Sequence, residues 1–200
     1  MAGRPRVGVL ALQGDVREHV ALLERLGAEV RRVRRPGEVD EIDGLVLPGG
    51  ESSVIDKLSR SFGLQEPLRA RIRSGMPVYG TCAGLILLAD TVLDGLAGQQ
   101  SFGGMDVAVR RNAFGRQTES FEIALDVPVL GPAPVHATFI RAPIVDRVGP
   151  GVDVLASLPD GAVVAVEQGA LLGTSFHPEM DGEPRFHARF LDRVRAFVGA

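Results

Sequence analysis

The chain has 200 residues, 45% of them apolar, which is enough for one well-buried core and too few for two independent domains. We therefore expect a single domain over residues 1–200. The net charge of −3 includes no basic block, which argues against nucleic acid as a partner.

Three further features bear on the compartment in which the chain works. The sequence contains no apolar run of the roughly 18 residues that a membrane span requires. Its N-terminal residues lead directly into a strand-like segment, without the long apolar stretch of a secretory signal. Cys82 is the only cysteine, so an intrachain disulfide is impossible. We expect a cytoplasmic protein.

Short apolar segments alternate with helical periodicity in the first half of the chain. Strands are predicted at residues 7–11, 29–33, 44–47 and 77–79. Helices are predicted at residues 16–26, at 66–73 and at 85–88, and another is predicted to run through Leu58 from a cap at Ser52 or Ser53. This alternation predicts an α/β fold with a mostly parallel open sheet and helices on both faces.

After about residue 98 the pattern changes to strands joined by turns. These are predicted at residues 106–110, 121–125, 135–140, 152–155, 163–167 and 171–175. A closing helix is predicted at 186–198, with Phe186, Phe190, Val194 and Phe197 on one side. The second half therefore adds antiparallel strands to the same domain.

The most informative segment is Gly80-Thr81-Cys82-Ala83-Gly84, between a predicted strand and a predicted helix. A nucleophile elbow has this order, because its sharp turn needs small flanking residues and projects the nucleophile. The dipole and unpaired N–H groups of the following helix favour a thiolate, and the N–H of Ala83 is placed to donate to an oxyanion. Taken alone, the segment also fits a buried structural cysteine.

A second polar motif, His177-Pro178-Glu179, follows the last predicted strand. If the chain stays extended through Pro178, the alternation of strand side chains puts His177 and Glu179 on the same side. A histidine can take the proton of a thiol, and a carboxylate can hold the tautomer of that histidine. Taken alone, the motif also fits an ordinary surface turn.

The other histidines are weaker candidates for a catalytic base. His19 and His187 fall on predicted helices, and His136 neighbours a predicted strand. No two histidines have a metal-ligand spacing beside the lone cysteine, so we expect neither a metal nor another cofactor.

Together these motifs resemble the triad glutamine amidotransferases, whose glutaminase domains carry Gly-x-Cys-x-Gly and a later His-Pro-Glu. A third segment, Leu47-Pro48-Gly49-Gly50-Glu51-Ser52, resembles that family's oxyanion and substrate loop. Further segments at 12–19, 111–117 and 139–143 are similar to the glutaminase subunit of pyridoxal 5′-phosphate synthase. The resemblance covers nearly the whole chain and implies the flavodoxin-like fold of class I glutamine amidotransferases.

The resemblance also implies roles for individual residues. Cys82 would be the nucleophile, His177 the base and Glu179 its orienting carboxylate. Gly50 and Ala83 would donate to the oxyanion. The residues implied to contact glutamine are Gly50, Glu51, Ser52, Arg111, Ile140 and Arg141. The physical chemistry agrees at Glu51, whose carboxylate suits the α-ammonium group of glutamine.

The implied reaction is hydrolysis of glutamine to glutamate and ammonia through a cysteine thioester. By resemblance, the ammonia passes to a synthase subunit, and twelve glutaminases surround a twelve-subunit synthase core. Residues 13–19 follow the first strand on the same side as the other motifs, so we expect the synthase to dock there.

Three alternatives remain open at this stage. A glutaminase that serves imidazole glycerol phosphate synthesis would share the triad but lack the segment at 111–117. A non-catalytic binding subunit of the same fold would usually have lost a triad member. A cysteine hydrolase or peptidase of similar topology would share the elbow but have no use for Pro48-Gly49-Gly50-Glu51-Ser52.

Overall fold

A computed structural model of the chain describes residues 4–111 and 120–199. Its centre is a ten-stranded sheet with the order β2-β1-β3-β4-β12-β11-β9-β6-β5, in which β10 pairs with β11. Strands β2, β1, β3, β4 and β12 are parallel neighbours, whereas β11 and β9 add antiparallel pairs. Strands β7 and β8 form a separate antiparallel ribbon.

The strands are β1 (Arg6–Leu10), β2 (Glu29–Val33), β3 (Gly44–Leu47), β4 (Val78–Thr81), β5 (Ala89–Val92), β6 (Met105–Arg110), β7 (Ser120–Leu125), β8 (Val135–Ile140), β9 (Ile144–Val148), β10 (Asp153–Ser157), β11 (Val163–Gln168) and β12 (Leu171–Thr174). The α-helices are α1 (Val16–Arg25), α2 (Ser52–Ser61), α3 (Gln65–Arg73), α4 (Ala83–Leu88) and α5 (Arg185–Val198). Two short 3₁₀ helices are η1 (Pro36–Glu41) and η2 (Pro128–Leu130).

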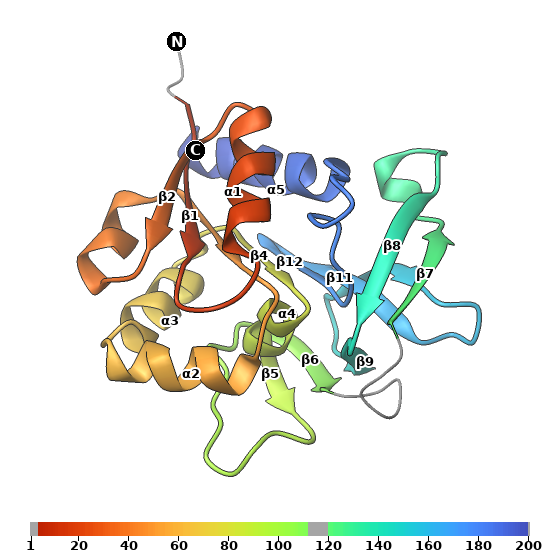
Figure 1. The fold of residues 1–200 in the computed structure, drawn as a ribbon, viewed down its shortest axis with the longest axis horizontal. Coiled ribbons are helices and arrows are strands. Elements are labelled where there is room, and N and C mark those ends of the chain that lie inside the picture. The colour runs from red at the N-terminus through yellow and green to blue at the C-terminus, as the bar shows by residue number, and fades with distance from the viewer. Residues whose placement is uncertain (1–3, 112–119, 200) are drawn as a thin grey trace.

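The helices cover both faces of the sheet (Figure 1). On one face, α1 and α5 pack through residues such as Leu23 and Phe190, together with the β7–β8 ribbon. On the other face, α2, α3 and α4 pack through residues such as Ile55, Leu68 and Leu87. Strands between two such layers must be apolar on both sides, which explains the fully buried run at β3.

The predicted α/β fold with added antiparallel strands is confirmed. The sequence patterns do not reveal β5 and β9. β5 begins directly after the last residue of the apolar α4 segment, without a turn residue to separate them. β9 contains Asp146 and Arg147, which interrupt its apolar pattern but pair across the strand with Arg110 and Asp106 of β6.

One detail of the predicted helices is wrong. The residue that caps α2 is Glu51, not Ser52 or Ser53, and its carboxylate accepts hydrogen bonds from the N–H and the hydroxyl of Ser53. The predicted apolar side of α5 is buried at Phe186, Phe190 and Val194, whereas Phe197, near the end of the helix, is 37% exposed. No helix in the described ranges is long and apolar enough to cross a membrane.

Candidate active site

The motifs singled out from the sequence lie at one edge of the sheet. Residues 13–15 follow β1, residues 48–52 follow β3, Cys82 follows β4, and residues 177–179 follow β12. These four strands are parallel neighbours in the order β1-β3-β4-β12, so their carboxyl ends meet at the same edge. Ligands of open α/β sheets usually bind at this edge.

Cys82 sits at a sharp turn between β4 and α4. Its φ of 48° and ψ of −101° are rarely adopted by residues other than glycine. The flanking glycines allow the turn. A Cβ on Gly84 would lie 2.1 Å from the carbonyl oxygen of Leu47, and one on Gly80 would lie 2.4 Å from the backbone of Gly84. The elbow expected from the sequence is therefore present.

A cavity of about 270 Å³ opens beside this turn. Its lining contains Cys82, His177 and all the residues predicted to contact glutamine, together with Gln13, Asp15 and Ile86. Pockets for drug-sized ligands usually measure about 300–1,000 Å³, so this cavity suits a smaller metabolite. Ala83 is the first residue of α4, and Glu179 lies behind His177.

His177 and Glu179 meet through a turn and not through an extended strand. The N–H of Met180 donates to the carbonyl oxygen of His177 at 3.2 Å, which closes that turn. The predicted extended geometry is therefore wrong, although the two side chains do come together. His177 Nδ1 lies 2.9 Å from Glu179 Oε1 and 3.4 Å from Asp15 Oδ2. With Nδ1 engaged there, Nε2 remains for chemistry at the cavity.

The charges around His177 favour its protonated form. Burial alone would lower the pKa of His177, but hydrogen bonds to Asp15, Cys82 and Glu179 and the charge of Cys82 raise that pKa to about 12. Burial would likewise raise the pKa of Glu179, but attraction to His19 and hydrogen bonds from His177 and His19 hold it well below its usual range. Glu179 is therefore a carboxylate at neutral pH, facing an imidazolium.

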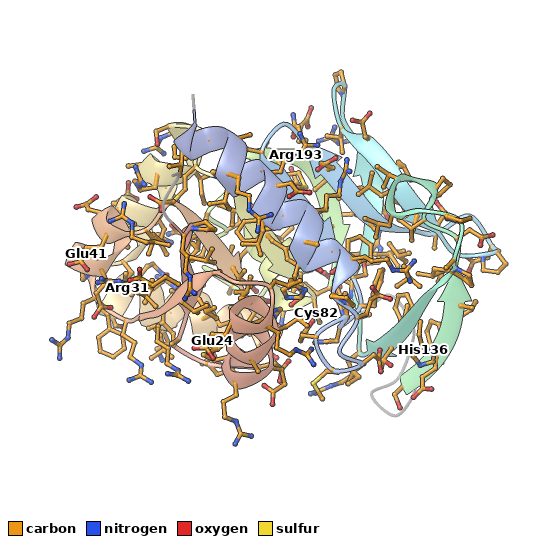
Figure 2. All side chains as sticks on the ribbon, turned by 90° about the horizontal axis from the view of Figure 1, so that it is seen from above. Glu24, Arg31, Glu41, Cys82, His136 and Arg193 are labelled. Atoms are coloured by element: carbon orange, nitrogen blue, oxygen red, sulfur yellow. The ribbon has the colours of Figure 1, made fainter. Side chains whose placement is uncertain are left out.

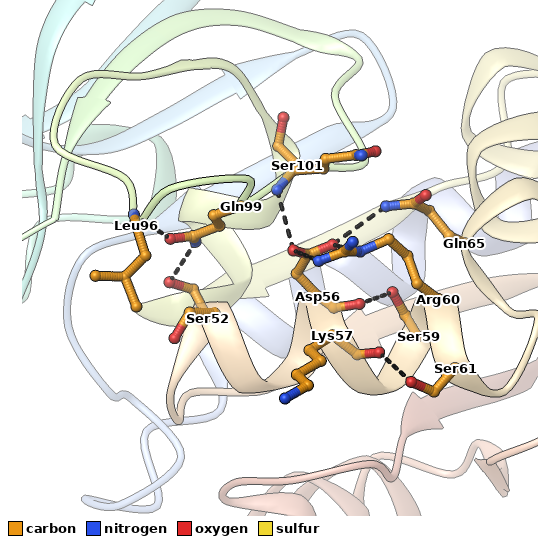
Figure 3. A network of polar contacts seen from close by, with 12 residues as sticks. Ser52, Asp56, Lys57, Ser59, Arg60, Ser61, Gln65, Leu96, Gln99 and Ser101 are labelled. Carbon is orange, nitrogen blue, oxygen red and sulfur yellow. Dashed lines mark hydrogen bonds and ion pairs between the residues drawn. The ribbon is translucent and has the colours of Figure 1, made fainter.

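A polar network joins the predicted substrate loop to the opposite wall of the cavity. Arg111 Nη2 donates to Glu51 Oε1 at 2.7 Å, and Arg111 Nη1 donates to Gln99 Oε1 at 3.0 Å. Gln99 Nε2 in turn donates to the Ser52 hydroxyl at 3.0 Å, as Figure 3 shows. Gln99 thus bridges two residues that the resemblance places in contact with glutamine.

The loop that carries Gln99 is anchored to α2 by Asp56, which is 1% exposed. The Asp56 carboxylate accepts hydrogen bonds from Arg60, from Gln65 and from the backbone N–H of Gln100 (Figure 3). A buried carboxylate is stable only when it is paired in this way. The hydrogen bonds of Asp56 therefore fix the position of the loop that carries Gln99 relative to α2.

The remaining predicted contacts come from β8. Ile140 is the last residue of that strand, and Arg141 follows it with a φ of 46°. The backbone N–H of His177 donates to the carbonyl oxygen of Thr138 at 3.1 Å, which ties β8 to the His177 turn. The ribbon thereby brings Ile140 and Arg141 to the cavity. Most of the predicted segment at 111–117 lies outside the described residues.

The other histidines do not face the cavity. His136 is exposed on β8, lies 3.2 Å from a carboxylate oxygen of Glu122, and stands well away from Cys82 (Figure 2). His19 and His187 are fully buried and lie behind Glu179. Within the described ranges, ligand atoms of Asp15, His177 and Glu179 lie within 4.8 Å of one another, as a metal site requires. In this structure Glu179 and Asp15 hydrogen-bond to His177 and so have a role without a metal. The expectation that no metal binds stays a prediction.

Sequence reasoning misses several residues of the site. Gln13 Oε1 accepts from the N–H of Glu51 at 2.7 Å, and Asp15 contacts His177. Both fall in the segment at 12–19 that resembles the family, but their roles depend on β1 lying beside β3. Gln99 lies in a loop without any motif, so no signal in the sequence points to it.

Comparison with known proteins gives a consistent family. Residues 9–196 match the model of the SNO glutamine amidotransferase family. The chain is 66% identical to "Pyridoxal 5′-phosphate synthase subunit PdxT" of Leifsonia xyli subsp. xyli, over 99% of this chain and 100% of the relative. It is 59% identical to the protein of the same name from Streptomyces coelicolor, over 98% and 96% of the two chains.

Solved structures agree with these relatives. A structure described as "Crystal structure of glutamine amidotransferase" superposes with a TM-score of 0.87 at 47% identity, covering 94% of this chain and 98% of the other. A putative GMP synthase component from Thermoplasma acidophilum superposes with a TM-score of 0.68 at 16% identity, over 98% and 97% of the chains. At that identity the second likeness concerns the fold alone.

Proposed function

The chain belongs to the SNO glutamine amidotransferase family, and we propose that it is the glutaminase subunit of a pyridoxal 5′-phosphate synthase. The observation that carries this proposal is the cavity in which Cys82, on its strained turn, meets the His177–Glu179 pair. The names of the full-length relatives supply the pathway. A cytoplasmic location stays a prediction from the sequence.

We propose the following reaction. The thiolate of Cys82, paired with the protonated His177, attacks the side-chain carbonyl carbon of glutamine and forms a tetrahedral oxyanion, to which the N–H groups of Gly50 and Ala83 donate. His177, protonated at neutral pH, gives its proton to the departing nitrogen, so that ammonia leaves and a glutamyl thioester remains. His177 then takes a proton from water, whose oxygen attacks the thioester. The C–S bond then breaks, glutamic acid leaves and gives its carboxyl proton to solvent, and the thiolate of Cys82 and the protonated His177 are restored.

The charges of the cavity wall fit a zwitterionic amino acid. Arg111 and Glu51 pair with each other at 2.7 Å in the described structure. An α-carboxylate can take the place of Glu51 beside Arg111, while an α-ammonium takes the place of Arg111 beside Glu51. Each charge then exchanges one ionic partner for another, so little desolvation is left uncompensated. Arg141 and Ile140 would complete the pocket over the side chain of glutamine.

The ammonia requires a second subunit, and we propose that the synthase docks against α1. Arg17 is 89% exposed there. Beside α1 runs a groove whose lining includes the acidic Glu18, Glu24 and Asp181, the basic Arg25 and the half-exposed Met180. An apolar residue within a rim of net negative charge suits a partner with complementary basic charge. The stoichiometry of twelve glutaminases on twelve synthase subunits also belongs to this proposal and rests on resemblance alone.

The first test measures glutamate release from glutamine by the protein alone and with the matching synthase subunit. We expect strong stimulation by the synthase and complete loss in Cys82→Ala. Glutaminase activity that requires Cys82 but is not stimulated by the synthase would support the glutaminase reaction and contradict the assigned pathway. If neither condition gives activity, and a thiol-alkylating glutamine analogue fails to label Cys82, the chain is a non-catalytic binding subunit.

Docking on α1 is tested by charge reversal. Arg17→Glu combined with Glu18→Arg should weaken synthase binding in sedimentation velocity and lower the stimulated glutaminase rate. Arg73→Glu reverses an exposed charge on α3, on the other face of the sheet, and serves as the matched control. Wild-type binding by the double variant would contradict docking at this surface. The mass of the saturated complex tests the stoichiometry.

A genetic test separates the pathway from its nearest rival. A deletion strain should be rescued by vitamin B6 and not by histidine. Rescue by histidine alone would contradict this proposal and indicate that the protein serves imidazole glycerol phosphate synthesis.

A further inference from the structure

The catalytic pair rests on a second layer of buried polar groups. His19, from α1, is 0% exposed, and its Nε2 lies 3.4 Å from Glu179 Oε1 and 3.1 Å from the Thr81 hydroxyl. The Thr81 hydroxyl itself donates to Glu179 Oε1 at 3.4 Å. On the far side of the ring, His19 Nδ1 lies 2.9 Å from Nε2 of His187, a fully buried residue of α5.

A purely structural role does not explain this arrangement well. Burying an imidazole costs free energy unless its nitrogens are hydrogen-bonded, and an aliphatic or aromatic side chain would fill the same space without that cost. Both nitrogens of His19 are hydrogen-bonded, and Nε2, which bonds to the Thr81 hydroxyl, also lies within ion-pair distance of the carboxylate that holds His177. Buried polar networks of this kind specify one geometry, because any other leaves a buried group unpaired.

The contacts of Glu179 converge on a single oxygen. His177, His19 and Thr81 all approach Oε1, whereas Oε2 has no hydrogen-bond partner among the described residues. A carboxylate held at one oxygen is free to rotate when a donor is removed. The orientation of Glu179, and with it that of the His177 ring, therefore depends on each of these few donors.

We propose that His19 is a positioning residue of the glutaminase reaction, whose Nε2–H donates to the Thr81 hydroxyl and lies within ion-pair distance of Glu179, so that it fixes the carboxylate that orients His177. This inference rests on the function proposed above. Nε2 must carry a proton, because a bare nitrogen lone pair facing a carboxylate oxygen would be repelled. His187 supports the ring from behind. Burial lowers the pKa of His187 to about 3, so it is a neutral partner at physiological pH.

The groups that face Glu179 come from several elements. Tyr79 and Thr81 belong to β4, and burial together with the charge of Glu179 raises the pKa of Tyr79. His187 comes from α5, and Asp15 precedes α1 and reaches His177 from the other side. Among these, His19 and His177 are the groups that lower the pKa of Glu179.

This arrangement predicts the sign of a pH effect. The lowered pKa of Glu179 keeps the carboxylate charged well into the acid range. Without His19, one lowering influence is lost, so the pKa of Glu179 moves up towards its ordinary value. In the variant, Glu179 is then protonated, and loses its hydrogen bond to His177 as a carboxylate, at a higher pH than in the wild type. Activity should therefore fall sooner as the pH decreases, an effect that a simple packing defect would not produce.

The test compares three substitutions at one position. His19→Leu fills the space but removes the donor. His19→Gln places an amide N–H near the position of Nε2, and His19→Asn is too short to do so. Val20→Ala, which creates a small packing defect at a neighbouring buried residue of α1, is the control. All variants are first checked for folding by circular dichroism and thermal unfolding.

Two readouts are measured for each variant. The first is kcat and KM for glutamine in the presence of the synthase subunit. The second is the rate at which iodoacetamide alkylates the free protein as a function of pH. Cys82 is the only cysteine, so alkylation reports the state of this thiol without requiring glutamine or a partner. The second readout therefore stands even if the proposed function is wrong.

We expect His19→Leu and His19→Asn to lower kcat by roughly 10- to 100-fold with KM changed less than about twofold. In both variants the fall of the alkylation rate on the acid side should occur at a higher pH than in the wild type. His19→Gln should restore most of kcat and most of the wild-type pH dependence. Folded Leu and Asn variants with a wild-type kcat and acid limb would overturn the proposal. So would equal losses in all three variants without any pH shift. If the wild type fails to hydrolyse glutamine, the glutaminase assignment falls and the alkylation profile alone decides the role of His19.

Discussion

Gly49 offers the sharpest test of the active-site geometry. A Cβ at this position would lie 2.3 Å from Cε1 and 2.8 Å from Nδ1 of His177, and 2.8 Å from Asp15 Oδ2. Ordinary contacts begin at about 3.4 Å, so in Gly49→Ala the ring must retreat by about 1.1 Å (3.4 − 2.3). The backbone of Gly49 is not in the left-handed region, so the alanine itself causes no backbone strain. The change acts on the histidine.

A 1 Å displacement of a catalytic group costs on the order of 100-fold in rate, or about 2.7 kcal/mol of transition-state stabilisation. We therefore expect kcat of Gly49→Ala to fall by about two orders of magnitude when glutamate release is measured with saturating synthase. Alkylation of Cys82 should slow as well, because it too depends on His177. Gly37→Ala is the control, since a Cβ there meets nothing within 4 Å. A Gly49→Ala variant with wild-type kcat, or with a loss confined to KM, would refute the reasoning.

Three further substitutions test the surroundings of the site. Gln99→Leu removes the bridge between Ser52 and Arg111. The KM for glutamine should therefore rise about tenfold, which corresponds to about 1.4 kcal/mol, while kcat changes less. A fall in kcat as large as the rise in KM would contradict a role of Gln99 in binding. Asp56→Asn weakens the anchor of the Gln99 loop, so the free energy of unfolding measured in urea should fall by about 1–3 kcal/mol. The control Lys57→Gln, at an exposed position of the same helix, should leave the free energy of unfolding unchanged. Burial holds the pKa of His187 at about 3, below the 6.5 of an unfolded histidine, so the unfolded chain gains a proton that the folded chain does not. Stability should therefore fall by up to about 1.4 kcal/mol per unit as the pH drops from 6.5 towards 3, and His187→Phe should lose this slope; an unchanged slope would contradict a buried neutral His187.

The fold is largely predictable, because its signals are local. The buried run at β3 and the helical spacing of Val16, Val20 and Leu23 each follow from a few neighbouring residues. β5 and β9 lack such signals. β9 exists because β6 and β11 lie on either side of it, and its charged residues find partners only after the sheet has formed. Long-range pairing of this kind leaves little trace in one segment.

The candidate site shows the same division. Cys82 is identifiable because its turn requires glycines at fixed offsets, and His177 because Pro178 and Glu179 stand beside it. The sequence predicts the meeting of His177 with Glu179 for the wrong reason, since a turn joins them and not an extended strand. His19 falls on a helix, and nothing in its neighbours marks it as part of a site. Only the placement of α1 against β4 and α5 shows that it faces Glu179.

Helix α1 physically connects the proposed docking surface to the proposed triad. Arg17 points to solvent, while Asp15, just before the helix, touches His177, and His19 touches Glu179. Residues two apart on a helix point in different directions, so one turn of α1 serves both surfaces. Leu23 fixes the helix in the core, and a rigid element cannot shift at Arg17 without shifting at Asp15 and His19. If the synthase docks on α1 as proposed, it should act on the orientation of Glu179 through the helix itself. The ratio of stimulated to unstimulated kcat should consequently be smaller in His19→Leu than in the wild type, whereas Val20→Ala should keep the ratio. An unchanged ratio in His19→Leu would mean that the synthase acts through the loop at Gly50 alone.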